Sequence, residues 1–220
     1  MRVVCVYTEQ HETSCRLVKR CVKTAKRFRV SVEPYQSVHW DEIDGMVEEL
    51  GLRLKLEPHK NKDTTTTHCP AFRLANGLTH YRLYRECERQ GEPIVILEHD
   101  AVIVGPLPDT YPDGVTQLSS HQNGQADSKW YRRGLGKFVA AGPEPDLSEA
   151  GIVPHPYTRI RGTSGYAITP SSAYRMVCHV QEGGVAYADR LHRDMVGDLW
   201  LVIPQPVETR GGVSGKSYYQ

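Results

Sequence analysis

One stretch of the chain decides the fold: Ile94-Val95-Ile96-Leu97-Glu98-His99-Asp100-Ala101-Val102-Ile103-Val104-Gly105. Its first residues are β-branched or aliphatic, which predicts a strand buried on both faces of a sheet. Side chains alternate along a strand, so Glu98 and Asp100 are expected on one side and His99 on the other. Two carboxylates that face together repel each other unless a cation or proton lies between them. Such a strand end is where open α/β sheets bind ligands, although a strand that simply ends in a polar turn explains the spacing equally well.

Length and composition indicate an ordinary globular protein. A chain of 220 residues suits one domain, residues 1–220, and can bury a sizeable core. The net charge of +1 predicts no global field that would attract nucleic acid or a membrane surface. No apolar run is long enough to span a bilayer, and the N-terminus lacks a signal-peptide pattern, so we expect a cytoplasmic protein. Six scattered cysteines without a Cys-x-x-Cys pair favour buried free thiols.

Apolar periodicity predicts strands that alternate with helices. Strands are expected at 2–7, 30–35, 94–97, 115–119, 165–169 and 200–203. Helices are expected at 14–28, 41–50, 72–89 and 170–181, and loops at 56–70 and 142–156. This alternation predicts an α/β layer sandwich rather than a barrel, because eight βα units do not fit in this length. The sequence has no glycine-rich phosphate loop of the Walker or dinucleotide-binding type. It also lacks Gly-x-Ser-x-Gly, which disfavours a hydrolase.

Three segments carry polar chemistry. A turn that begins at Thr8 precedes the first helix, where hydroxyls and free amides can contact phosphate or ribose, or can simply cap the helix. The helix at 14–28 has one continuous basic face, which could hold a polyanion, although most such faces are only solvated. In Lys129–Lys137, basic residues such as Arg133 alternate with aromatic ones such as Trp130. These side chains could clamp a pyrophosphate, a sugar or a base, or could form a surface hairpin.

Four blocks follow one another over about residues 70–215: Asn76–Tyr81, Leu97–Val102, Gly162–Thr169, and Asp189 with the tail Pro204–Ser214. In order and rough spacing they resemble the family 25 glycosyltransferases, the group of lipopolysaccharide-biosynthesis enzymes and collagen galactosyltransferases. Two features depart from the family pattern. His99 stands where the family usually has Asp, and the Arg-rich signature after the first strand is missing.

The resemblance implies a GT-A fold with a mixed central sheet, and transfer of a sugar from a nucleotide-sugar, with a UDP-sugar expected, to an acceptor hydroxyl. The leaving diphosphate is best met by a hard divalent cation, Mn²⁺ or Mg²⁺, for which Glu98 and Asp100 are the expected ligands. Asp189 is the expected base for the acceptor proton, with Asp194 as its substitute. The donor side is expected to include Thr8, Glu98, His99 and Asp100. The acceptor or donor side is expected to include Thr163, Ser164, Tyr166, Trp130 and Arg133.

Two alternatives stay open. The acceptor, a saccharide or a hydroxylated side chain by family precedent, could instead be a hydroxymethylated base in DNA, because the chain has two basic segments and virus-encoded glycosyltransferases modify such bases. A flipped base would then leave a gap that Trp130 could fill. The other alternative is a non-catalytic nucleic-acid-binding module whose acidic strand end is structural.

Overall fold

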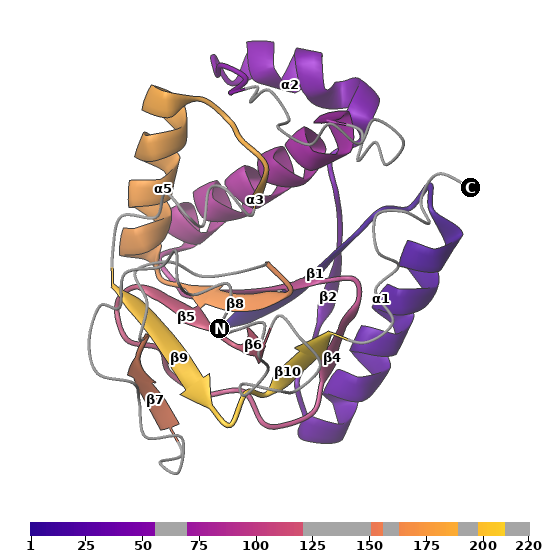
Figure 1. Cartoon of the computed structure of the whole chain (residues 1–220), viewed down its shortest axis with the longest axis vertical. Helices are drawn as coiled ribbons and strands as arrows, with labels where there is room; N and C mark the ends of the chain where they lie inside the picture. Colours follow the sequence, from indigo (N-terminus) through magenta and orange to yellow (C-terminus); the bar gives the residue numbers. More distant parts are fainter. Residues whose placement is uncertain (56–69, 121–150, 156–162, 189–197, 210–220) are drawn as a thin grey trace, which may run out of the picture.

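The computed structural model describes residues 1–55, 70–120, 151–155, 163–188 and 198–209 (Figure 1). The strands are β1 (Arg2–Tyr7), β2 (Glu33–Gln36), β3 (Ile94–Glu98), β4 (Ala101–Ile103), β5 (Val115–Gln117), β6 (Ser119–Ser120), β7 (Gly151–Pro154), β8 (Gly165–Ile168), β9 (Leu199–Ile203) and β10 (Val207–Thr209). The helices are α1 (Glu12–Ala25), η1 (Lys26–Phe28), η2 (Trp40–Glu42), α2 (Ile43–Glu49), α3 (Pro70–Gln90) and α5 (Pro170–Gly183). Among these residues, no helix is both long and apolar enough to cross a membrane.

The strands form a seven-stranded sheet in the order β2-β1-β3-β8-β5-β9-β7 and a three-stranded sheet in the order β4-β10-β6. In the large sheet, β1, β2, β3, β5 and β9 run in one direction, whereas β8 and β7 run in the other. The predicted α/β layer sandwich with a mixed central sheet is therefore confirmed. The carboxyl ends of the five parallel strands meet at one edge of this sheet.

Alternating side chains divide the core into two layers. Val4, Ile96 and Tyr166 pack in one cluster with residues of α3 and α5, whereas Cys5 and Leu97 pack in another with α1 and the small sheet. Figure 1 accordingly places α3 and α5 on one side of the large sheet and α1 on the other. The expected free thiols Cys5, Cys21 and Cys87 are buried in these layers.

The central stretch differs from the prediction in one decisive respect. The strand ends at Glu98, His99 and Asp100 form a turn, and Ala101 begins β4 in the other sheet, paired with β10. Strand alternation therefore does not extend through Asp100, and the expectation that Glu98 and Asp100 share one side for that reason is wrong.

Besides β4, two short strands lie where the sequence predicted none. Gly151–Pro154 was expected within a loop but forms β7, an edge strand antiparallel to β9, where Pro is tolerated because one side of the strand makes no ladder. Val207–Thr209 was not expected to form a strand but forms β10, which pairs with both β4 and β6. The partners of both strands are distant in sequence, and neither strand has a clear apolar pattern of its own.

Candidate functional site

The carboxyl edge of the parallel strands gathers several of the predicted site residues. Glu98 ends β3 beside β1, and its N–H donates to the Ser164 carbonyl over 3.1 Å. Thr8 follows β1 at the same edge. Its N–H donates to Ser14 Oγ over 2.9 Å, and its hydroxyl lies 3.0 Å from Ser37 Oγ. Two loops and the start of α1 are thus held together by hydroxyl groups.

The Glu98 carboxylate is positioned from two sides. Thr163 donates a hydrogen bond from Oγ1 to Glu98 Oε1, and Asn76 Nδ2 of α3 lies 3.4 Å from the same oxygen. Thr163 and Ser164 are each only 3% exposed, so they hold the strand end more than they offer surface. The predicted residues Glu98, Thr163 and Ser164 therefore lie together, whereas Asn76 was not predicted as a site residue.

The close packing of α3 explains how Asn76 reaches the strand end. A Cβ atom on the next residue, Gly77, would lie 1.9 Å from the Ala186 carbonyl oxygen. Only glycine allows this approach. A glycine in the middle of a helical pattern is the sequence signal that could have pointed to this part of α3.

The turn formed by His99 and Asp100 lies next to α1, whereas the Glu98 carboxylate is bonded to Asn76 of α3. Arg20 Nη2 of α1 donates to the Asp100 carbonyl over 3.3 Å. Burial lowers the pKa of His99; the Asp100 charge opposes this shift, and the charges of His11 and Arg20 add to it. Asp100 Oδ1 is buried and has no hydrogen-bond partner among the described residues. Sequence reasoning missed His11 and Arg20, because their proximity to this turn depends on how α1 packs.

Tyr166 lies in the core rather than on a wall of the site, contrary to its expected role. It is fully buried, with its hydroxyl 2.7 Å from His80 Nδ1 and 3.1 Å from the Tyr84 hydroxyl, both on α3. The His80 and Tyr166 rings are stacked, with centroids 5.8 Å apart. Burial lowers the pKa of His80 to about 3 and raises the pKa of Tyr166. This neutral network is close to Glu98, because Tyr166 follows Gly165, which pairs with Leu97 at the end of β3.

The other predicted residues cannot be placed. Asp189, Asp194, Trp130 and Arg133 lie outside the described residues, as does the rest of Lys129–Lys137. Within the described part of the chain, no group of three or more His, Cys, Asp or Glu side chains could hold a metal ion.

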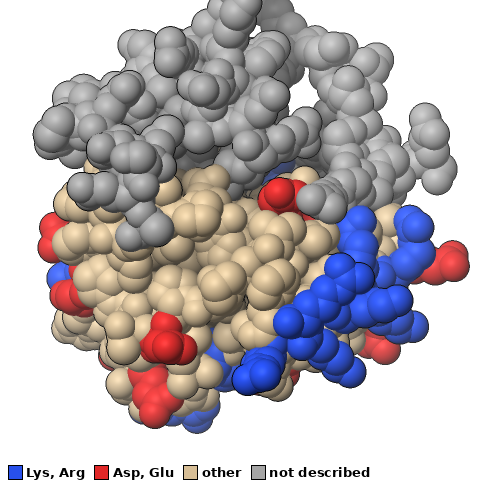
Figure 2. Space-filling view, turned by 90° about the horizontal axis from the view of Figure 1, so that it is seen from below, with Lys and Arg blue, Asp and Glu red and all other residues tan. Residues whose placement is uncertain are grey.

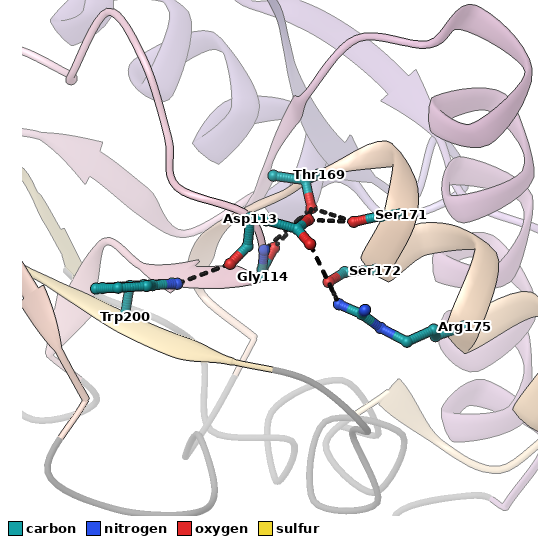
Figure 3. Close-up of polar contacts among 7 residues, drawn as sticks. All are labelled: Asp113, Gly114, Thr169, Ser171, Ser172, Arg175 and Trp200. Atoms are coloured by element: carbon teal, nitrogen blue, oxygen red, sulfur yellow. Dashed lines mark hydrogen bonds and ion pairs between the residues drawn. The ribbon is translucent and has the colours of Figure 1, made fainter.

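A second polar cluster lies at the opposite, amino edge of the parallel strands (Figure 3). The exposed Asp113 carboxylate accepts hydrogen bonds from the hydroxyls of Ser171 and Thr169, and the latter bond is 2.6 Å long. These bonds, and to a lesser degree the charge of Arg175, lower the pKa of Asp113. The Asp113 carbonyl accepts a 2.8 Å bond from Trp200 Nε1. The cluster ties the start of α5 to β9, so its role is structural.

Comparisons with known proteins yield only distant structural likenesses, which include two enzymes. No family model matches the chain, and no curated protein matches its sequence. The CTP:phosphocholine cytidylyltransferase of Streptococcus pneumoniae is similar at 9% identity and a TM-score of 0.43, over 94% of this chain and 91% of that one. A glycosyltransferase involved in glycosylation of the major capsid of PBCV-1 is similar at 8% identity and a TM-score of 0.40, over 98% of this chain and 95% of that one. At these values neither likeness assigns a family or an activity.

Proposed function

We propose that this protein is a glycosyltransferase that moves a sugar from a nucleotide-sugar, such as a UDP-sugar, to an acceptor hydroxyl of a saccharide or similar molecule. One observation carries the proposal. At the carboxyl edge of the parallel strands, the Glu98 carboxylate is held by Thr163 and Asn76, and two residues later Asp100 has a buried oxygen without a partner among the described residues. Ligands of open α/β sheets bind at this edge, and the four blocks of sequence resemblance include it.

The residues present fit a divalent metal that arrives with the donor. Mg²⁺ is usually held by one or two carboxylates together with substrate phosphates, so a protein cage of three side chains is not required. Asp100 is the proposed ligand, because its unpartnered Oδ1 is an oxygen of the type that Mn²⁺ or Mg²⁺ prefers. Glu98 was the second ligand expected from the sequence, and its carboxylate is bonded to Thr163 and Asn76. When bound, such an ion stabilises the negative charge that develops on the leaving diphosphate.

The chain's own residues supply further support for an anionic donor. Thr8 and the first turn of α1 present hydroxyl and amide groups at a helix N-terminus, which favours phosphate. Arg20, beside the Asp100 carbonyl, adds positive charge to the same corner. Asp189 remains the proposed base for the acceptor proton, a role that needs direct contact with the acceptor hydroxyl.

Ligand-induced stabilisation tests the proposal. A ligand at about 100 times its Kd stabilises the native state by about 2.7 kcal/mol. For a chain of this size, that raises Tm by about 5–10 °C. Thermal unfolding is measured with a panel of nucleotide-sugars, with and without Mn²⁺. We expect one nucleotide-sugar class to raise Tm, and Mn²⁺ to enlarge the shift.

Two matched variants localise the effect. Asp100→Asn should remove the metal-dependent part of the shift, whereas Asp113→Asn removes the same charge at the opposite edge and should retain it. Each variant is compared with its own ligand-free Tm, because Asp113 also anchors α5. Release of nucleoside diphosphate is then followed with the donor that binds. The proposal fails if no nucleotide-sugar changes Tm, and the metal assignment fails if Asp100→Asn responds like the unmodified protein.

A further inference from the structure

The outer face of α1 and η1 carries an unusual concentration of positive charge. Seven Lys and Arg residues and no Asp or Glu occur between Arg16 and Arg29, although the whole chain has 27 basic and 26 acidic residues. We call the exposed members the α1 basic face: Arg16, Lys19, Lys23, Lys26, Arg27 and Arg29. Figure 2 shows Lys and Arg side chains gathered in one broad patch on the side where Figure 1 places α1.

Helix geometry makes this face continuous. At 3.6 residues per turn, the basic residues between Arg16 and Arg27 fall within an arc of about 120° around the helix axis. The opposite arc contains Leu17, Val18, Cys21 and Ala25, all of which are buried against the sheet. The basic side chains therefore point away from the core, and their charges form one row along the helix.

The stability of the fold does not account for this arrangement. Basic residues favour the C-terminal end of a helix, which explains Lys23 and Lys26 but not Arg16 and Lys19 in the first half of α1. Solvated faces usually mix both signs of charge. Among the residues that the structure describes, no carboxylate forms an ion pair with any member of the α1 basic face.

We propose that the α1 basic face binds the phosphate backbone of a nucleic acid. From Arg16 to Arg27 the helix is about 16 Å long. Phosphates of one DNA strand are spaced about 3.4 Å apart along the axis of the duplex, so this length matches about five successive phosphates. Arginine guanidinium groups can form two parallel hydrogen bonds to a phosphate, and the lysines add point charges.

A lipid surface is a poorer match. Helices that lie in a membrane interface insert an apolar face, whereas the apolar face of α1 is buried in the core. The large apolar side chains exposed in the described residues are Met1, Trp40 and Tyr174, none of which lies on α1. Binding would therefore depend on charge that is spaced along a polyanion.

The position of the face connects it to the candidate site. Arg20, on the same helix, contacts the backbone of Asp100, so a strand bound along α1 would pass close to the carboxyl edge of the sheet. Binding of nucleic acid to the α1 basic face is separate from the proposed transfer reaction. It can occur or be absent whether or not the protein transfers a sugar.

The experiment measures binding of the full chain to a labelled DNA duplex of about 20 base pairs and arbitrary sequence, over about 50–200 mM salt. Five phosphate contacts predict that the logarithm of the association constant falls with a slope of about −4.5 against the logarithm of salt concentration. The variant Lys19→Gln/Lys23→Gln/Lys26→Gln should bind more weakly, with a slope smaller in magnitude by about three. The matched control, Arg53→Gln/Arg85→Gln/Arg89→Gln, removes three exposed charges elsewhere and should bind like the unmodified protein.

Circular dichroism and thermal unfolding establish that both triple variants are folded. A single-stranded probe of equal length and vesicles with anionic phosphatidylserine are measured in parallel. Loss of duplex or single-strand binding in the α1 variant alone supports the proposal. Three results would overturn it: no binding of either nucleic acid at about 50 mM salt, equal loss in both variants, or binding to the anionic vesicles alone.

Discussion

His80 makes the stability of this protein sensitive to acid. Its ring is fully buried between α3 and β8, and burial lowers its pKa from 6.5 to about 3. In the unfolded chain the ring takes up a proton below about pH 6.5, whereas in the native protein it stays neutral until about pH 3. The unfolded state therefore binds more protons as the pH falls, and the free energy of unfolding decreases throughout this interval.

The size of the effect follows from the two pKa values. Stability should fall by about 1.4 kcal/mol for each pH unit below the unfolded pKa. Between pH 7.5 and pH 5.0, the contribution of His80 is about 2 kcal/mol. This interval lies above the pKa of ordinary carboxyl groups. The lowered pKa of His99 adds acid sensitivity of the same sign, so the contribution of His80 is the difference between His80→Gln and the unmodified protein.

Urea unfolding at several pH values between 7.5 and 5.0 measures this contribution. In His80→Gln, an amide can still bond to Tyr166 but does not titrate, so the loss of stability with acid should be smaller by about 2 kcal/mol. Tyr84→Phe is the control, because it weakens the same buried network and leaves the titrating ring in place. It should be less stable at every pH and keep the acid dependence of the unmodified protein.

The same pH dependence in His80→Gln and in the unmodified protein would show that His80 does not cause the acid sensitivity. If His80→Gln does not fold, the ring can be followed directly in the unmodified protein by NMR. A His80 signal that titrates between pH 7.5 and 5.0 would mean that the ring is not buried in its neutral form.

Two further predictions test the packing of α3 beside the site and of α5 at the opposite edge of the sheet. Gly77→Ala places a Cβ 1.9 Å from the Ala186 carbonyl oxygen, so the free energy of unfolding should fall by at least about 2 kcal/mol in urea titrations; a loss below about 0.5 kcal/mol would mean that α3 does not pack so closely. Asp113→Ala removes the two hydroxyl hydrogen bonds at the start of α5 and should lower stability by about 1–2 kcal/mol. Its nucleotide-sugar response in thermal unfolding should be unchanged, and loss of that response would assign Asp113 to the site.

Local pattern was sufficient for most of the layer architecture. The apolar run Ile94–Leu97 predicted the buried strand β3, and the spacing of apolar residues predicted α1, α3 and α5. Each of these elements repeats its pattern over several residues. The end of β3 was predicted to within one residue, but no Gly or Pro marks the turn at His99 as the start of a strand in a second sheet. The chain changes sheets there to pair with Val207–Thr209, a segment about a hundred residues away that no local pattern reveals.

The candidate site was likewise predicted only in part. Glu98 was predicted because a carboxylate after a buried apolar run is conspicuous in sequence. The hydrogen bond of Arg20 to Asp100 and the effect of the His11 charge on His99 depend on how α1 crosses the sheet. Tyr166 was expected to line the site because the resemblance of the Gly162–Thr169 block to the family implied it. The alternation of β8 instead turns it toward His80 on α3.

The two edges of the sheet separate a structural carboxylate from a candidate ligand-binding one. Asp113 and Glu98 both accept hydrogen bonds from threonine hydroxyls, so hydrogen bonding alone does not distinguish them. Asp113 is linked through its partners to the start of α5 and the edge of β9, and these contacts explain its position fully. Glu98 is followed within two residues by Asp100, whose buried Oδ1 has no partner among the described residues. A buried carboxylate oxygen costs free energy unless something binds it. Asp100, rather than the more conspicuous Glu98, is therefore the residue at this edge whose environment the fold leaves incomplete.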